Sequence, residues 1–215
     1  MTHARKMDID QAIDTGMSLL GNLKDKPAEI LDLAFQSDFP RRILAPHHVG
    51  LLAPPGSHAE LFNVIKARGH LLSVLRSSVV TAELTKRFGK QVGVDIYLCR
   101  SLKTDTPKLE VFRVVEGLNA ANIRAAIPHV LHVAYTPRET VDMETIYSSI
   151  IADGFEYVGG GINQNKLMSK EDAITVFYFR KRPPVEGIPK IELFLPGRHS
   201  PPPNAETTPA PVSVR

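Results

Sequence analysis

The chain has 215 residues, of which 43% are hydrophobic, and it carries a formal net charge of +3 at pH 7. This length and composition predict one large domain or two small ones with a buried core, and they exclude a chain that is disordered throughout. The single cysteine, Cys99, excludes an internal disulfide framework and every CxxC-type zinc or redox site. Any bound metal would therefore be held by histidines and carboxylates.

Charge and hydropathy also limit the partners that we expect. There is no run of about 18 apolar residues, and MTHARKMDIDQAI lacks the apolar segment of a secretory signal. We therefore expect a soluble, cytoplasmic protein with no membrane partner. The densest basic cluster, RKRP at 180–183, is either a solvated strand end or an anion-binding patch. Without tryptophan, and without basic residues interleaved with aromatics, we expect no nucleic-acid partner.

Residues 1–40 are predicted to form an N-terminal helical extension. After Asp8, apolar residues recur at helical spacing, and Pro27 then opens a second amphipathic stretch, AEILDLAFQ. The apolar stripes of these helices could cap a sheet, serve contacts with a partner protein, or form the surface of a possible homodimer. At the other end, residues 198–215 are rich in proline and poor in large apolar side chains, and we expect them to be disordered.

Between these flanks the chain runs twice through the same order of predicted elements. A first module at 41–118 has one strand, one helix and three strands: ILAPHHVGLLA, SHAELFNVIKARG, HLLSVLRSSVV, VGVDIYLCR and KLEVFRV. A second module at 128–197 repeats that order: HVLHVAYTP, ETVDMETIYSSIIADG, FEYVGGG, AITVFYFRK and KIELFLPG. The segment RSSVVTAELTKRFGKQ is expected to add a long loop between the second and third strands. The fold class is therefore α+β, built from tandem βαβββ modules.

Each module contributes one histidine and one glutamate from equivalent places. His48 and His132 lie on the first predicted strand of their modules, and Glu110 and Glu192 lie on the fourth. A carboxylate flanked by apolar strand residues is costly to bury unless it meets a cation or a strong donor. Two imidazoles and two carboxylates suit a divalent transition metal with positions left for water or substrate.

The ordered set of H-V-[GA] on the first strand and [IL]-E-[LV]-F on the fourth, in both modules, resembles the vicinal oxygen chelate superfamily. That superfamily includes glyoxalase I, extradiol-type dioxygenases, methylmalonyl-CoA epimerase, and fosfomycin and bleomycin resistance proteins. The resemblance covers residues 43–197 and implies a cup-shaped mixed sheet with a metal inside the cup. It nominates four metal ligands, of which the two glutamates are also candidate catalytic groups: His48, Glu110, His132 and Glu192. The implied cofactor is a divalent transition metal, one of Fe, Ni, Co, Mn or Zn, and the implied partner is a small-molecule substrate.

Strand alternation favours these histidines over their neighbours. His47 and His48 would face opposite sides of a regular strand, and His129 and His132 would do the same if their strand runs unbroken. His47 and His129 stay as alternative ligands. The other alternative is that His48 and His132 only pack in the core and bind no metal.

The same alternation places Gly50 and Ala134 on the inward face, where small residues would leave room for a ligand. Among the carboxylates, Glu116 is an alternative to Glu110, which could also pair with a nearby Lys108 or Arg113 at a sheet edge.

Three kinds of function remain open. A His-Glu-His-Glu set resembles the glyoxalase and isomerase branch and favours lyase or isomerase chemistry, in which a glutamate carries a proton from an enolate or enediolate. A set of two histidines and one carboxylate would resemble the non-haem Fe(II) dioxygenase branch. Loss of the ligands would leave a metal-free binding or resistance protein, which the four retained residues oppose.

Overall fold

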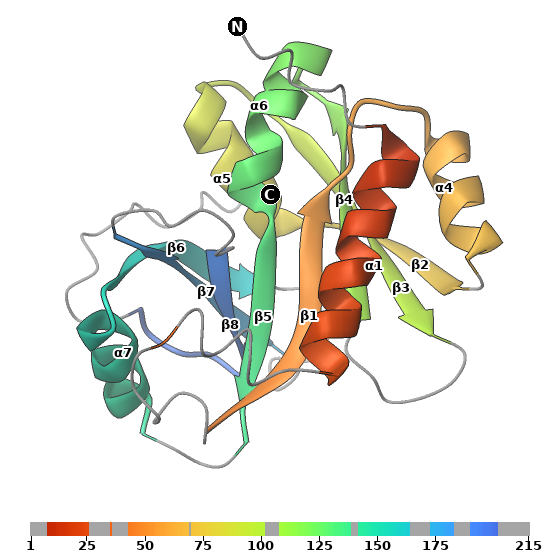
Figure 1. The fold of residues 1–215 in the computed structure, drawn as a ribbon. Helices are drawn as coiled ribbons and strands as arrows, with labels where there is room; N and C mark the ends of the chain where they lie inside the picture. Colours follow the sequence, from red (N-terminus) through yellow and green to blue (C-terminus); the bar gives the residue numbers. More distant parts are fainter. Residues whose placement is uncertain are drawn as a thin grey trace, which may run out of the picture.

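Eight strands form one mixed sheet in the computed structural model, which describes residues 8–25, 35, 43–68, 70–101, 108–138, 142–163, 173–182 and 190–201. The strands are β1 (Leu44–Leu52), β2 (His70–Arg76), β3 (Gly93–Ser101), β4 (Lys108–Glu116), β5 (His132–Pro137), β6 (Phe155–Asn163), β7 (Ile174–Lys181) and β8 (Lys190–Pro196). The helices of these ranges are α1 (Ile9–Asp25), α4 (His58–Ala67), α5 (Ser78–Phe88), α6 (Ala120–Val130) and α7 (Met143–Ala152). Figure 1 shows the sheet curling between them.

The strand order β2-β3-β4-β1-β5-β8-β7-β6 confirms the predicted fold class. In each module the first strand runs parallel to the fourth, as β1 does to β4 and β5 to β8, while β1 and β5 meet antiparallel at the centre. Val49 lies opposite Val133 at this junction, so the modules are related by an approximate twofold axis there. The first strands of both modules therefore lie side by side at the middle of the sheet.

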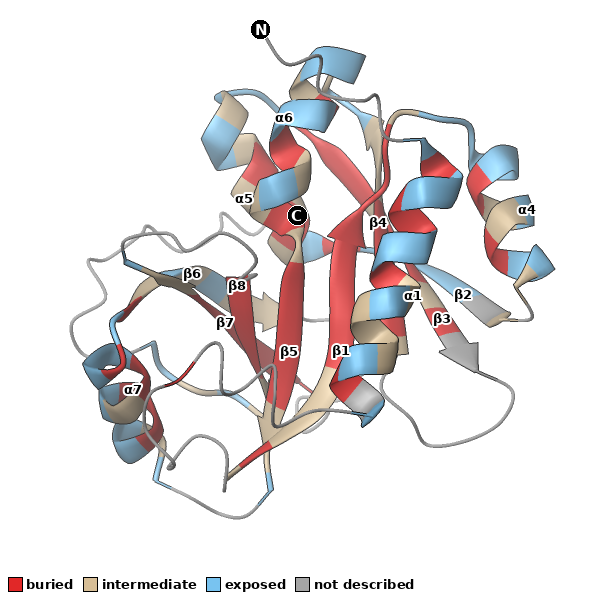
Figure 2. Cartoon of the chain, viewed as in Figure 1, coloured by how far each residue is buried: buried red, intermediate tan, exposed pale blue. Residues whose placement is uncertain are grey.

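One face of the sheet, which we call the outer face, carries the larger core. Residues such as Val49 and Leu51 of β1 pack there against α1, α4 and α7 through apolar residues of those helices. The predicted N-terminal helix is confirmed as α1, and its Gly16 allows close packing, because a Cβ there would lie 2.3 Å from Leu51 Cδ2. The second predicted N-terminal helix and the tail beyond residue 201 lie outside the described residues. Figure 2 shows the central strands buried and the solvent faces of the helices exposed.

The opposite face, which we call the inner face, is covered in the first module by two helices that were not predicted. The stretch HLLSVLRSSVV is strand only as far as Arg76, and helix α5 occupies most of the expected loop. Ser77 caps that helix by accepting a hydrogen bond from the Val80 N–H, and Gly89 ends it at φ 63°. Val80 and Leu84, one turn apart, pack against strand residues such as Phe112.

Helix α6 corrects the predicted start of the second module. HVLHVAYTP was expected to be a strand from residue 129, but α6 runs to Val130 and β5 begins at His132. Asn119 caps the helix, and Pro128 is accommodated inside its last turn. Among the described helices, none is long and apolar enough to cross a membrane.

Candidate metal centre

The four nominated residues lie together on the inner face at the junction of the modules. In the β1–β5 pair, His48 lies opposite Ala134 and Gly50 opposite His132. In the flanking pairs, Gly50 lies beside Glu110, and Ala134 lies beside Glu192. Each histidine is therefore set against the small residue of the other module, and each glutamate is one strand away. Residues up to 144 positions apart in sequence meet because two first strands pair at the sheet centre.

Three of the four side chains form a tight, buried cluster. The Nε2 atoms of His48 and His132 are 3.2 Å apart, and Glu192 places Oε1 3.5 Å from His48 Nε2 and Oε2 3.2 Å from His132 Nε2. These three residues expose 1–2% of their surface, and their ligand atoms lie within 4.8 Å of one another, as a metal site requires. Glu110 joins from the side, with Oε2 3.5 Å from His48 Nε2 and 14% of its side chain exposed.

The other ring nitrogen of each histidine has its own partner. His132 Nδ1 lies 2.7 Å from the Val130 carbonyl oxygen, so it must carry the proton, and the lone pair is on Nε2. His48 Nδ1 lies 2.8 Å from His47 Nδ1. Partners of this kind fix the orientation and tautomer of metal-binding imidazoles. Both rings therefore present Nε2 to the centre of the cluster.

His47 was expected to face away from His48, and this expectation is wrong. The pairing of β1 with β5 shifts register between Pro46 and His48, which is a bulge at residue 47. The His47 ring consequently stacks on Phe194 of β8 at a centroid distance of 4.0 Å, and Phe194 also contacts the His48 ring edge-on. His47 thus supports His48 as a hydrogen-bond partner, a role that sequence reasoning missed because it assumed regular alternation.

The other residues considered from the sequence lie outside this cluster. His129 is on α6, where its ring contacts Arg87 and Arg180. Glu116 lies at the exposed end of β4 with 62% of its side chain accessible, near Arg76. Lys108 shares the inner face of β4 with Glu110, two residues away, and it lies opposite His48.

Gly50 is required by the packing of the site. A Cβ built there would lie 2.1 Å from His132 Cε1 and 2.2 Å from His132 Nε2. The small residue on the inward face was expected to leave room for a ligand; the space at Gly50 is instead taken by the imidazole of the other module.

Burial dominates the electrostatics of the cluster. It raises the pKa of Glu192 well above its ordinary value, assisted by the nearby Glu110 and opposed by a hydrogen bond with the Tyr178 hydroxyl. Burial also raises the pKa of Glu110 to about 7, against the charge of Lys108. Among the histidines, burial and then the charge of Lys190 lower the pKa of His132 to about 3, and burial and then His132 lower that of His48. Neutral imidazoles are the form that binds metals.

Lys190 is a cation near Glu192 that has a carboxylate partner of its own, and its charge also acts to lower the pKa of Glu192. Lys190, on the same face of β8, is 4% exposed, but its Nζ lies 3.0 and 3.1 Å from the carboxylate oxygens of Glu83 on α5. The same ammonium lies 4.1 Å from the ring centroid of Tyr178. Helix α5 therefore supplies a counterion for Lys190, so that Lys190 offsets the buried carboxylates of the cluster only in part.

The donor set fits a divalent transition metal. The cluster brings three acceptors together, namely the Nε2 lone pair of His132 and the carboxylates of Glu110 and Glu192. His48 Nε2 can supply one proton to them, and the Tyr178 hydroxyl donates to Glu192. Without a cation, such a group must take up protons, in agreement with the raised pKa values of both glutamates. Imidazole nitrogens with carboxylate oxygens suit iron, nickel, cobalt, manganese or zinc. His48, His132 and Glu192 would hold the ion, with Glu110 within reach.

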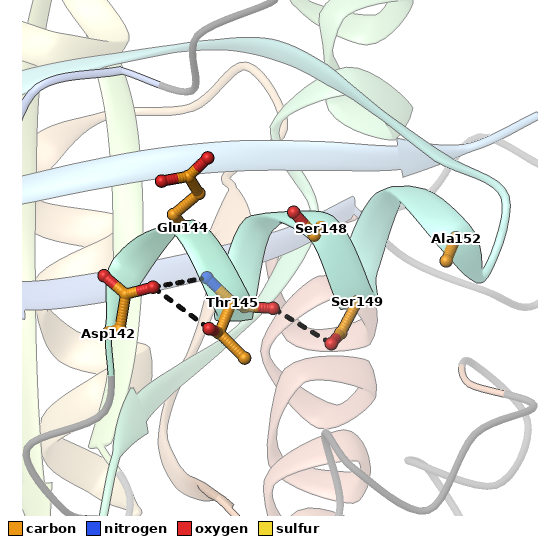
Figure 3. A pocket seen from close by; sticks show the side chains of 6 residues that line it. All are labelled: Asp142, Glu144, Thr145, Ser148, Ser149 and Ala152. Atoms are coloured by element: carbon orange, nitrogen blue, oxygen red, sulfur yellow. Dashed lines mark hydrogen bonds between the residues drawn. The ribbon is translucent and has the colours of Figure 1, made fainter.

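A separate surface hollow lies along α7, away from the cluster (Figure 3). It is lined by Asp142, Glu144, Thr145, Ser148, Ser149 and Ala152. Asp142 accepts hydrogen bonds from the Thr145 N–H and hydroxyl at 3.1 and 3.0 Å, and the Ser149 hydroxyl donates to the Thr145 carbonyl at 2.9 Å. These bonds cap and stabilise the helix, so the hollow offers no separate chemistry.

Comparison with known proteins finds only distant structural matches. No protein-family model and no curated protein sequence matches this chain. Among solved structures, a mutant of 4-hydroxymandelate synthase from Streptomyces coelicolor aligns with 74% of this chain and 51% of its own, at 11% identity and a TM-score of 0.47. Methylmalonyl-CoA epimerase from Streptomyces coelicolor aligns with 71% of this chain and 97% of its own, at 11% identity and a TM-score of 0.42. A glyoxalase family protein from Bacillus cereus aligns with 71% of this chain and 93% of its own, at 17% identity and a TM-score of 0.27.

A glyoxalase family protein and methylmalonyl-CoA epimerase, two kinds of protein in the superfamily that the sequence motifs resemble, are among these distant matches. This chain spans about half the length of the 4-hydroxymandelate synthase. With identities of 17% or less and TM-scores below 0.5, these matches carry no argument about this chain. The function is therefore argued from the site itself.

Proposed function

We propose that the chain is a metal-dependent enzyme of the lyase or isomerase type, acting on a small oxygenated metabolite. The observation that supports this most is the convergence of His48, His132 and Glu192 from two modules, with both Nε2 atoms turned to one point. A divalent metal bound there would stabilise negative charge on two neighbouring substrate oxygens as a Lewis acid.

Glu110 is the proposed proton carrier. Of the two carboxylates it is the more exposed, with 14% of its side chain accessible against 3% for Glu192, and its pKa of about 7 suits a general base near neutral pH. Its carboxylate would take a proton from the carbon next to a substrate carbonyl, and the electron pair of the broken C–H bond would move to the carbonyl oxygen. The protonated Glu110 would then return the proton to the substrate. Lys108, beside it on the inner face, adds a positive charge that favours ionised Glu110.

Glu192, nominated both as ligand and as catalytic group, is assigned here to binding. It contacts both imidazoles and is hydrogen-bonded with Tyr178, so it has little freedom to move. His47 and the Val130 carbonyl keep the two histidines oriented.

One test addresses the metal and the reaction together. Protein purified without chelator should contain about one equivalent of a divalent transition metal, and His48→Ala should lose it. Metal-loaded protein in D₂O should exchange carbon-bound hydrogen in some members of a panel of 2-oxo acids, hydroxyketones and acyl thioesters, measured by proton NMR. Glu110→Gln should abolish this exchange and keep the metal. A stably folded protein that never takes up metal would contradict the proposal.

A non-haem Fe(II) dioxygenase is the second candidate. It is favoured by one feature, the tight grouping of two histidines with the single carboxylate Glu192, from which Glu110 stands apart. Ferrous protein that consumes O₂ with a substrate from the panel, and keeps this activity in Glu110→Gln, would select the dioxygenase over the isomerase.

A further inference from the structure

Three basic residues from three elements meet at the edge of the inner face. Arg87 is in the last turn of α5, His129 in the last turn of α6, and Arg180 near the end of β7. Arg87 Nη2 contacts His129 Nε2, and Arg180 Nη2 lies 3.4 Å from His129 Nδ1. His129 and Arg180 are half-buried, and Arg87 is exposed, so the group can be reached from solvent.

The contacts of His129 do not satisfy all three residues. Both guanidinium groups are donors without acceptors, whereas a neutral imidazole has one lone pair and one N–H. His129 can therefore accept from one arginine only, and its N–H then faces the other. Protonation would make all three groups donors, and the two arginines act against it: after burial, their charges are the next causes that lower the pKa of His129. The arrangement lacks an acceptor.

Glu83 and Glu156, the nearby carboxylates of the described ranges, do not supply that acceptor. Glu83 is one helical turn before Arg87, but both of its oxygens are engaged by Lys190 at 3.0 and 3.1 Å. Glu156, opposite Arg180 in the β6–β7 pair, forms its ion pair with Arg182 instead. Among the residues that the structure describes, neither Arg87 nor Arg180 forms an ion pair.

We propose that Arg87, His129 and Arg180 form a binding site for an oxyanion, either a phosphate or a carboxylate group. One oxyanion supplies several acceptor lone pairs to two guanidinium forks and one imidazole N–H, which is the geometry that arginines recognise best. The two arginines of the basic stretch RKRP at 180–183 therefore have different roles. Arg180 belongs to the anion site, while Arg182 forms a surface ion pair with Glu156.

The site is next to the metal centre and separate from it. Arg180 is two residues along β7 from Tyr178, which lies opposite Glu192, and two strand residues span about 7 Å. The inference goes beyond the proposed function and does not depend on a metal, because none of the three residues contacts the cluster.

A calorimetric titration of the full chain with inorganic phosphate tests the proposal. It is carried out at constant ionic strength and in the presence of chelator. We expect saturable binding that weakens about tenfold or more in Arg180→Gln and in Arg87→Gln, because each removes one charged fork. Arg180→Lys should retain part of the affinity, since it keeps the charge and loses the fork. Circular dichroism before each titration would verify folding.

Arg182→Gln is the matched control, since it removes a neighbouring arginine that is already paired with Glu156. Its phosphate affinity should stay within about twofold of wild type. Glu192→Gln should also bind phosphate normally, which separates this proposal from the metal centre. Repeating the titration with acetate distinguishes a phosphate site from a carboxylate site, and tighter binding of either anion supports the proposal. Phosphate binding that is absent in wild type, or equal in Arg180→Gln and Arg182→Gln, would overturn it.

Discussion

The two modules place the same residue types at equivalent strand positions but hold them differently. Glu192 of the second module is buried, contacts both imidazoles and is hydrogen-bonded with Tyr178. Glu110 of the first module reaches one imidazole and is partly exposed. The lysines two residues before them also differ, because Lys190 is buried against Glu83 while Lys108 is half-buried and faces the site.

The histidines show the same contrast. His132 is oriented by a backbone carbonyl, which no side-chain substitution can remove, whereas His48 is oriented by the side chain of His47. In the proposed function, His132 and Glu192 would form the more rigid pair of ligands and His48 and Glu110 the more adjustable pair. The second module would then serve mainly in metal binding, and the first would supply the proton carrier Glu110.

The largest expected effect is the difference between the two glutamates in metal binding. Glu192→Gln should weaken metal binding by about 100-fold or more, because it removes a ligand held against both imidazoles, while Glu110→Gln should cost about tenfold or less. Metal content after gel filtration and calorimetric titration would measure both. Glu116→Gln, on the exposed end of the same strand as Glu110, is the control. Equal losses in the two variants would refute the division of roles.

Gly50→Ala should displace His132, a member of the rigid pair, although Gly50 itself belongs to the first module. The added methyl overlaps the His132 ring, so we expect the ring to move, metal affinity to fall by tens of fold, and the protein to lose about 1–3 kcal/mol of stability. Thermal unfolding and metal titration would measure these changes. Gly21→Ala is the matched control, since a Cβ there meets nothing within 4 Å on α1 and should stabilise the helix by up to about 1 kcal/mol. A harmless Gly50→Ala would show that the ring has room.

His47→Phe should affect the adjustable pair more mildly. Phenylalanine can keep the stacking on Phe194 but removes the Nδ1 contact that orients His48, so metal affinity should fall by about tenfold. Unfolding free energy should change little because the apolar contact remains. Unchanged affinity would mean that the His47 contact does not support the ligand.

The smallest expected effect is a change in the number of protons released on metal binding. Burial raises the pKa of Glu110 from its ordinary 4.5 to about 7, so below pH 7 the metal-free protein holds a proton there that a bound cation displaces. Metal affinity should therefore rise as the pH increases through 7, and Glu192, whose pKa burial also raises, adds to this rise. Calorimetry at pH 6 in two buffers with different ionisation enthalpies should show about one proton fewer released by Glu110→Gln than by wild type. Equal proton release would place the titrating group elsewhere.

The sequence by itself determined the order of the repeated elements and the four candidate side chains. Alternating strands, glycine-terminated helices and the words HVG and HVA were sufficient, because these signals are local or repeat at corresponding places. Helices α5 and α6 carried local signals too: Ser77 and Asn119 cap them, and Val80 and Leu84 are spaced by one turn. Helix α5 was missed because its first residues were assigned to the strand HLLSVLRSSVV, and α6 was missed because its last residues were assigned to the strand HVLHVAYTP.

Only the tertiary structure decided which side chains meet. The bulge at His47 depends on how β1 pairs with β5, and the role of Gly50 depends on the ring from the other module that lies across it. The engagement of Lys190 by Glu83, and of His129 by two arginines, arises because α5 and α6 fold onto the inner face. Sequence pattern fixes the period of each element, whereas long-range pairing sets the neighbours, burial and charge balance of each functional group.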